Sequence, residues 1–183
     1  GCVLGEGAAM LVLEDRQRAI ARGATILAEV AGGANTADAF HQVALPDDGE
    51  GLVRAMRGAL AEAGIAPDGI GYLNAHGTAT EMNDRVEAAV IHTVFGADTP
   101  PVSSTKAATG HTLGAAGALE AAIAIEALRH GILPPTRNHD DDDPGIALDV
   151  IPNVARKARI DAVMSNSMGF GGHNTVLVFT RPA

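Results

Sequence analysis

One stretch constrains the fold of this chain more than any other, the apolar run Leu113–Ile125. It is apolar on nearly every side of a helix, which is typical of a helix packed between two layers, whereas a surface helix shows only an apolar stripe. We therefore expect a central buried helix within 112–128, ended by Gly131. Glu120 breaks the pattern, because a lone carboxylate in an apolar helix is destabilising unless a cation meets it. Lys106 is the nearest candidate cation in the sequence, so we predict a buried Lys106–Glu120 pair.

The residues just before this run are suited to hold a neutral histidine. Thr109, Gly110 and His111 lead into the run, so we expect them at a helix N-terminus. Unpaired N–H groups leave a partial positive charge there. This charge favours the neutral imidazole of His111, which can donate one hydrogen bond.

Size and composition indicate a single globular unit. The chain has 183 residues, and 46% of them are hydrophobic, which is enough for a sizeable core. The formal net charge of -9, without a Lys/Arg cluster, excludes a nucleic-acid partner. Because Glu120 and Glu126 interrupt the best apolar run, we expect no membrane-spanning segment. The single cysteine, Cys2, excludes a disulfide framework and a cysteine zinc cluster, and favours a reducing, cytoplasmic location.

Apolar runs of strand and helix character alternate along the chain. The predicted strands cover 8–14, 26–30, 70–74, 102–105, 162–166 and 175–179. Besides the central helix, the predicted helices cover 15–22, 50–63 and 84–95, the last capped by Asn83, and the predicted surface loops cover 35–48 and 139–143. This order predicts an α/β fold with a mixed sheet, in which ligands bind at the C-terminal ends of strands.

Three loops that follow predicted strands carry groups suited to chemistry. His76 and His111 each follow a predicted strand, and Phe170 stands among glycines between the last two strands. An isolated loop histidine most often only satisfies a turn. Two histidines in glycine-flanked, hydroxyl-rich loops, with an aromatic ring on a third flexible loop, indicate a reaction site instead.

The three loops belong to long motifs. These are Asn-Ala-His-Gly-Thr-Ala-Thr at 74–80, Ser-Ser-Thr-Lys-Ala-Ala-Thr-Gly-His-Thr-Leu-Gly-Ala-Ala-Gly at 103–117, and Asn-Ser-Met-Gly-Phe-Gly-Gly-His-Asn at 166–174. In this order they resemble the C-terminal half of the elongating β-ketoacyl-acyl carrier protein synthases, of the thiolase superfamily. The similarity covers essentially the whole chain, 1–183, and the paired histidines separate it from thiolases and from the initiating synthases. The resemblance implies a thiolase-like half, with the central helix between two sheets.

The resemblance also implies a reaction, a decarboxylative Claisen condensation that extends an acyl chain by two carbons from malonyl-acyl carrier protein. His76 and His111 match the paired histidines, whose N–H groups stabilise the enolate oxygen and assist decarboxylation. Lys106, tied to Glu120, matches the supporting cation. The remaining roles that carry over are phosphopantetheine binding for Thr78 and Thr80, and gating of the acyl-cysteine for Phe170.

The same resemblance implies partners and leaves the pathway open. It implies no cofactor beyond the phosphopantetheine arm that acyl carrier protein delivers. The implied partners are acyl carrier protein, malonyl and acyl thioesters, the N-terminal half of the synthase and, for the full enzyme, a second copy. Fatty-acid and polyketide elongation both fit, and the preferred acyl length is set largely by the N-terminal half.

The family's nucleophile is a cysteine on a strained strand-to-helix turn in its N-terminal half. Cys2 instead matches an apolar position beside the turn Gly5-Glu6-Gly7, so we expect a structural role for it. We therefore interpret the chain as the C-terminal catalytic half of the synthase, with the N-terminal half absent, and expect no condensation by this half alone.

Three rival interpretations come from other classes. Ser103 and Lys106 have the Ser-x-x-Lys spacing of some serine hydrolases, whose other signatures are absent from the sequence. A metal site built from His76, Asp84, His111 and Glu120 lacks the close histidine pair of known metal motifs. A non-catalytic partner resembling chain-length factors has no chemical need for the two histidines and Lys106.

Overall fold

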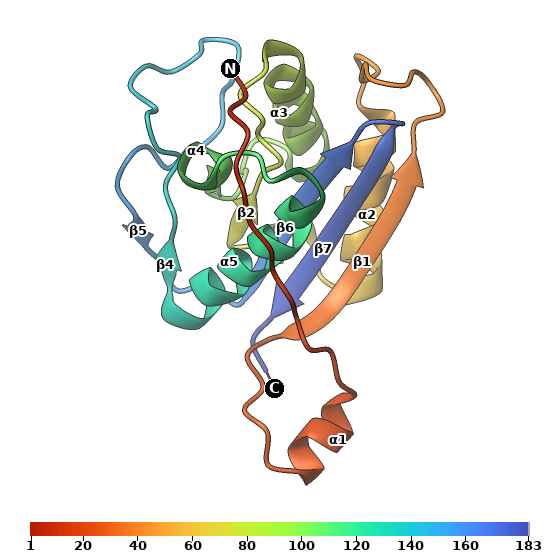
Figure 1. Cartoon of the computed structure of the whole chain (residues 1–183), viewed down its shortest axis with the longest axis vertical. Coiled ribbons are helices and arrows are strands. Elements are labelled where there is room, and N and C mark those ends of the chain that lie inside the picture. Colours follow the sequence, from red (N-terminus) through yellow and green to blue (C-terminus); the bar gives the residue numbers. More distant parts are fainter. Residues whose placement is uncertain (183) are drawn as a thin grey trace.

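A computed structural model describes residues 1–182 as three layers, with helices on both faces of a five-stranded sheet (Figure 1). The strands are β1 (Glu29–Ala37), β2 (Tyr72–Asn74), β3 (Val102–Ser103), β6 (Ala162–Gly169) and β7 (His173–Thr180), in the order β1-β7-β6-β2-β3. Neighbours are antiparallel from β1 to β6 and parallel from β6 to β3. The predicted α/β class with a mixed sheet is confirmed.

The two faces of the sheet carry separate apolar cores. Helices α2 (Glu50–Ala63) and α3 (Glu81–Phe95) cover one face, and α5 (Ala116–His130) covers the other. Side chains alternate between the faces along each strand, so Leu73 packs towards α2 while Tyr72 packs towards α5. The remaining elements are α1 (Arg16–Ala21), η1 (Pro67–Gly69), α4 (Lys106–Thr109), η2 (Leu113–Ala115), β4 (Ile132–Leu133) and β5 (Arg156–Lys157).

Helix α2 has the predicted bounds, and it ends at Gly64, whose left-handed backbone (φ 64°) suits a glycine cap. Helix α1 also lies within its predicted range. Helix α3 begins earlier than predicted, with Thr80 at the N-cap. The predicted cap, Asn83, is wrong, because it lies buried in the first turn and donates to Asp84 Oδ1 at 3.0 Å.

Strand β1 begins three residues later than the predicted 26–30 and reaches further, taking in 35–37 of the predicted surface loop. It pairs along its length with β7, and as an edge strand it tolerates polar side chains. Asn35, for example, accepts a hydrogen bond from Thr175 Oγ1 at 2.6 Å. Gly32 brings α2 close to this strand, since a Cβ there would lie 2.3 Å from the carbonyl oxygen of Ala59.

The predicted strand over 8–14 is wrong in the part of the chain that is described. These residues have no regular structure, and the N-terminal segment passes in front of the start of α5 before it runs down to α1 (Figure 1). Met10 is 95% exposed and Val12 is 89% exposed. The local pattern is that of a strand, yet no other segment among residues 1–182 lies beside it to form a sheet.

Helix α5 ends at Gly131 as predicted, but it is not buried on all sides. Its sheet-facing side is buried through Ala116, Glu120, Ala121, Ala124, Ala127 and Leu128. The opposite side, which includes Leu119 and Ile123, is half-buried. The predicted central buried helix is therefore correct for one face only.

The last two strands form a hairpin that is tighter than predicted. The predicted connection was eight residues long in 167–174, whereas β6 and β7 extend into it and leave only residues 170–172 as a turn. The turn is tied to the segment that follows β1, because Gly171 N–H donates to Gln42 O at 2.7 Å and Asp38 N–H donates to Gly172 O at 2.9 Å.

No helix in residues 1–182 is long and apolar enough to cross a membrane.

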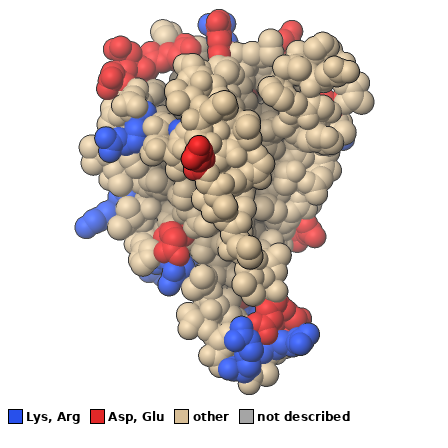
Figure 2. Space-filling model, viewed as in Figure 1, with Lys and Arg blue, Asp and Glu red and all other residues tan. Residues whose placement is uncertain are grey.

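We expect the isolated chain to self-associate at micromolar concentration. The side of the molecule crossed by residues 8–14 shows few charged side chains (Figure 2), and its exposed apolar groups include Met10 and Val12. Large exposed apolar patches mark interaction surfaces. Light scattering tests this expectation, and the variant Met10→Lys/Val12→Lys serves as a control with weaker association. A wild-type chain that stays strictly monomeric would contradict it.

Candidate functional site

His76 lies just past the C-terminal end of β2, on a loop that a buried carboxylate holds in place. Glu87, in α3, is 2% exposed. It accepts hydrogen bonds from the N–H groups of His76 and Gly77, both at 2.9 Å, and from Asn166 Nδ2 at 3.2 Å. The carboxylate thus fixes the backbone on which the imidazole is mounted. Glu87 was not among the predicted site residues, although a lone acid on the apolar side of a helix is the same signal that pointed to Glu120.

His111 lies after the parallel neighbour β3, so the two histidines come from the same edge of the sheet. As predicted, His111 lies at the N-terminal end of a helical segment: it directly precedes Thr112, the N-cap of η2, and η2 runs into α5 at Ala116. The preceding helix, α4, ends at Gly110 with φ 71°. The N–H of Leu113, in η2, donates to His111 Nδ1 at 3.2 Å. With Nδ1 as acceptor, the neutral ring carries its proton on Nε2.

The two loops meet, and the two imidazoles lie together. Ser104 Oγ donates to Gly77 O at 2.7 Å, which joins the loop of His76 to the segment that leads to His111. The ring centroids of His76 and His111 are 5.6 Å apart, at an interplanar angle of 86°. The two rings therefore contact each other edge to face. Their joint action on one oxygen atom stays a prediction.

The predicted ion pair lies beside the histidines. Lys106 Nζ donates to Glu120 Oε1, and both side chains are buried. Burial raises the pKa of Glu120, while the adjacent Lys106 acts to lower it. A cation held here by α5 acts on both imidazoles.

Burial and charge keep both imidazoles neutral. Burial lowers the pKa of His76 to about 3, and Lys106 and His111 add to the effect. Burial, and then Lys106, also lower the pKa of His111. Nδ1 of His76 has no hydrogen-bond partner among residues 1–182, so no acceptor there holds the proton on that nitrogen. The pair is therefore suited to donate hydrogen bonds to an oxygen that gains negative charge.

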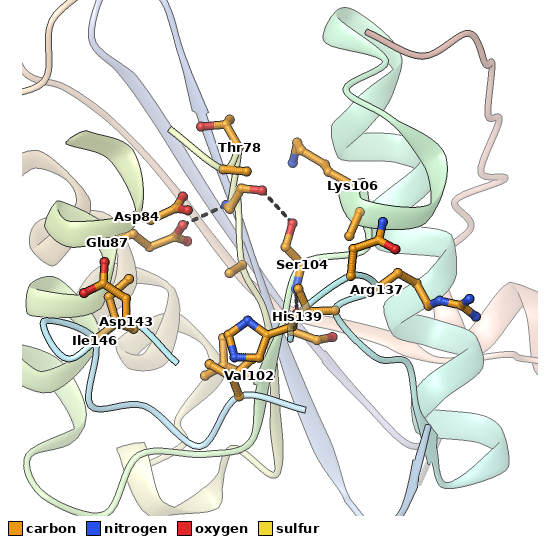
Figure 3. A pocket seen from close by; sticks show the side chains of 18 of the residues that line it. Thr78, Asp84, Glu87, Val102, Ser104, Lys106, Arg137, His139, Asp143 and Ile146 are labelled. Carbon is orange, nitrogen blue, oxygen red and sulfur yellow. Dashed lines mark hydrogen bonds between the residues drawn. The ribbon is translucent and has the colours of Figure 1, made fainter. Parts of the chain in front are cut away.

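A pocket of about 560 Å³ opens beside the pair (Figure 3). Lys106 and His111 line it, together with Thr78. Figure 3 shows Asp84 and Asp143 on one side of this pocket, and Lys106 and Arg137 on the other. Burial raises the pKa of Asp84, and Asp143 adds to the rise. The positive side of the pocket is thus the side that holds the lysine of the site.

The other predicted site residues lie in exposed segments. Thr78 and Thr80 lie on the loop of His76, with their hydroxyl oxygens 2.9 Å apart. Phe170 lies at the tip of the β6–β7 turn and is 75% exposed. Their roles in binding and gating stay predictions.

The contacts of the described residues argue against the hydrolase and the metal-site interpretations. Ser103 Oγ is paired with the Tyr72 hydroxyl at 2.7 Å, while Lys106 is paired with Glu120, so they do not form a nucleophile and base. Among residues 1–182, no three His, Cys, Asp or Glu side chains form a group that could hold a metal ion. Cys2 is exposed and lines the pocket, so it does not pack as the structural cysteine we expected.

Comparison with known proteins places the chain in a family. Residues 27–140 match the family model described as beta-ketoacyl synthase, C-terminal domain. The chain belongs to the β-ketoacyl synthase C-terminal domain family. The predicted resemblance is thereby confirmed, including the thiolase-like fold.

Relatives of this ketosynthase domain include the 3-oxoacyl-[acyl-carrier-protein] synthase 2 of Coxiella burnetii, which is 49% identical over 99% of the chain. The chain spans 44% of the length of that relative. The solved structure of the ishigamide ketosynthase/chain length factor is similar to 100% of the chain, with a TM-score of 0.97 and 43% identity. The match spans 45% of the length of that structure's chain. A type II polyketide acyl-carrier protein in complex with its ketosynthase covers 93% of the chain and is covered to 42%, with a TM-score of 0.89 and 36% identity.

Proposed function

We propose that this ketosynthase domain is the C-terminal catalytic half of a 3-oxoacyl-acyl carrier protein synthase. Its reaction is the decarboxylative condensation of an acyl-enzyme with malonyl-acyl carrier protein in fatty-acid or polyketide elongation. The observation that carries the proposal is the pair of imidazoles with lowered pKa values, whose ring centroids lie 5.6 Å apart beside a buried lysine. Residues 1–183 form one domain in this proposal, and an N-terminal half supplies the nucleophilic cysteine.

The two histidines act on the malonyl thioester. When the bond to its carboxylate breaks, carbon dioxide leaves and the electron pair moves into an enolate, whose oxygen becomes negative. His111 Nε2–H and the imidazole of His76 donate hydrogen bonds to this oxygen. The enolate carbon then attacks the acyl-cysteine carbonyl, and the cysteine thiolate leaves as the new carbon–carbon bond forms. Lys106, positioned by Glu120, adds a fixed positive charge that favours the enolate.

The substrate arrives on a carrier. Thr78 and Thr80, whose hydroxyls lie at an exposed loop beside the pocket, hold the phosphopantetheine arm, and Phe170 screens the acyl-cysteine. The similar polyketide structure that contains an acyl-carrier protein with its ketosynthase supports this partner. The reaction needs no cofactor of its own, and we place it in the cytoplasm. The full enzyme acts as a homodimer.

The second candidate is a non-catalytic partner subunit. Its support is the similarity to the ishigamide structure, whose description names a chain length factor beside the ketosynthase. A purely structural subunit has no need for two histidines at contact distance with a buried lysine, which favours the catalytic role.

A chimera tests the proposal and separates the two candidates. This chain replaces the matching segment of the Coxiella burnetii synthase, and condensation is measured with malonyl-acyl carrier protein. We expect activity in the chimera, and a loss of about 10²–10³-fold for either His76→Ala or His111→Ala, since each removes a donor to the enolate. His130→Ala, at the exposed far end of α5, is the control.

Two outcomes would contradict the proposal. One is condensation within threefold of the parent chimera in both histidine variants. The other is a stoichiometric acyl adduct on Cys2 when the isolated chain meets an acyl thioester, measured by mass spectrometry, because that adduct would make the chain its own source of nucleophile.

A further inference from the structure

The N-terminal segment is joined to the histidine loop through its backbone. His111 N–H donates to Val3 O at 2.7 Å, and Gly5 N–H donates to His111 O at 3.0 Å. Leu4 and His111 thereby form an isolated parallel bridge, although they are far apart in the sequence. The side chains of Val3 and Leu4 are largely exposed. The contact therefore depends on the backbone and not on these two side chains.

Two glycines make this approach possible. A Cβ at Gly5 would lie 2.2 Å from the carbonyl oxygen of Thr109 and 3.1 Å from Gly110 Cα. A Cβ at Gly110 would in turn lie 2.8 Å from Gly5 Cα, and the backbone of Gly110 is left-handed, at φ 71°. Real Cβ atoms essentially never come within 3.0 Å of backbone atoms, as they would at 2.2 Å and 2.8 Å here, so the two chain segments touch only because both positions lack a side chain.

His111 needs such an anchor. Its side chain is only half-buried, and the helix breaks on both sides of it, after α4 and before η2. Among residues 1–182, its ring has one hydrogen-bond partner, the N–H of Leu113 two residues further along the same loop, and it contacts the ring of His76. The pairing with residues 3–5 is thus what ties the backbone of this loop to another part of the chain at the histidine itself.

We infer that Gly5 is a positioning residue for the condensation, because its missing side chain lets residues 3–5 hold the backbone of His111 and so place its imidazole beside His76. The inference rests on the proposed function for its catalytic consequence. The pairing itself does not depend on that function.

Hydrogen exchange in the unmodified 183-residue chain tests the pairing directly. We expect the amide hydrogens of His111 and Gly5 to exchange at least tenfold more slowly than those of the unpaired residues around Met10. Exchange of the His111 amide at the rate of those residues would overturn the inference, whatever the activity.

The variant Gly5→Ala tests the consequence, with Gly1→Ala as the matched control, since a Cβ at Gly1 meets no atom within 4 Å. We expect Gly5→Ala to shift the ring resonances of His111 in NMR spectra, and to lower kcat in the chimera about tenfold or more with KM changed less than threefold. We expect Gly1→Ala to leave the His111 ring resonances, kcat and KM unchanged. Unshifted His111 resonances in Gly5→Ala would overturn the positioning role. Shifted resonances with full activity would instead overturn the catalytic role of His111, and with it the proposed function.

Discussion

Replacing Glu120 with alanine should lower the free energy of unfolding by about 3–5 kcal/mol, because it leaves the ammonium group of Lys106 buried without its partner. Both side chains of the pair are buried, on α4 and α5. Chemical denaturation of the chain measures the loss. A loss below about 1 kcal/mol would mean that solvent or another group already stabilises the charge of Lys106.

Two further variants show where the loss comes from. Glu126→Ala, on the exposed side of the same helix, removes a carboxylate that pairs with Arg129 and His130 at the surface, and should cost less than about 1 kcal/mol. Lys106→Met/Glu120→Leu removes both charges, and should recover most of the stability that Glu120→Ala loses. If the double variant is as unstable as the single one, the loss comes from packing and not from the unpaired charge.

The buried imidazole of His76 should make the chain lose stability in acid. Its pKa is about 3 in the folded chain, against the ordinary value of 6.5, and burial is the main cause. Below pH 6.5 the unfolded chain therefore binds more protons than the folded chain, so stability falls as the pH falls from 6.5 towards 3. His76 alone should lower the free energy of unfolding by about 2 kcal/mol between pH 7 and pH 5.

Comparison with His76→Gln isolates that effect. Burial raises the pKa of Glu87 and of Glu120, which acts in the opposite direction, and both groups are present in either protein. Between pH 7 and pH 5, the unfolding free energy of the wild-type chain should therefore fall by about 2 kcal/mol more than that of His76→Gln. Parallel curves for the two proteins would show that His76 is accessible to protons in the folded chain.

Local patterns predicted the elements whose cause is local. The bounds of α2 follow from apolar residues at helical spacing and a glycine stop. Residues 8–14 have the pattern of a strand but do not form one, since a strand pattern becomes a strand only when a neighbour pairs with it. The four-residue helix α4 was not predicted, because so short a segment shows no helical periodicity. The regular helix α5 also begins later than the predicted 112, since the backbone at Leu113 is left-handed.

The site was predictable where one residue stood out against its surroundings. Glu120 inside an apolar helix pointed to Lys106, and the structure joins them. Glu87 gave the same signal within α3, but nothing in the sequence shows that its partners are backbone N–H groups on another loop. The distance between His76 and His111 likewise depends on β2 and β3 being parallel neighbours, which the order of elements alone did not specify.

The two imidazoles are anchored to different parts of the chain. His76 is tied through Glu87 to α3, and His111 is tied to residues 3–5. Substitutions in α3 shift one ring, and substitutions near the start of the chain shift the other. Substitutions in either part can therefore change the gap between the rings, and with it the fit of the enolate in the proposed reaction, while both histidines stay unchanged.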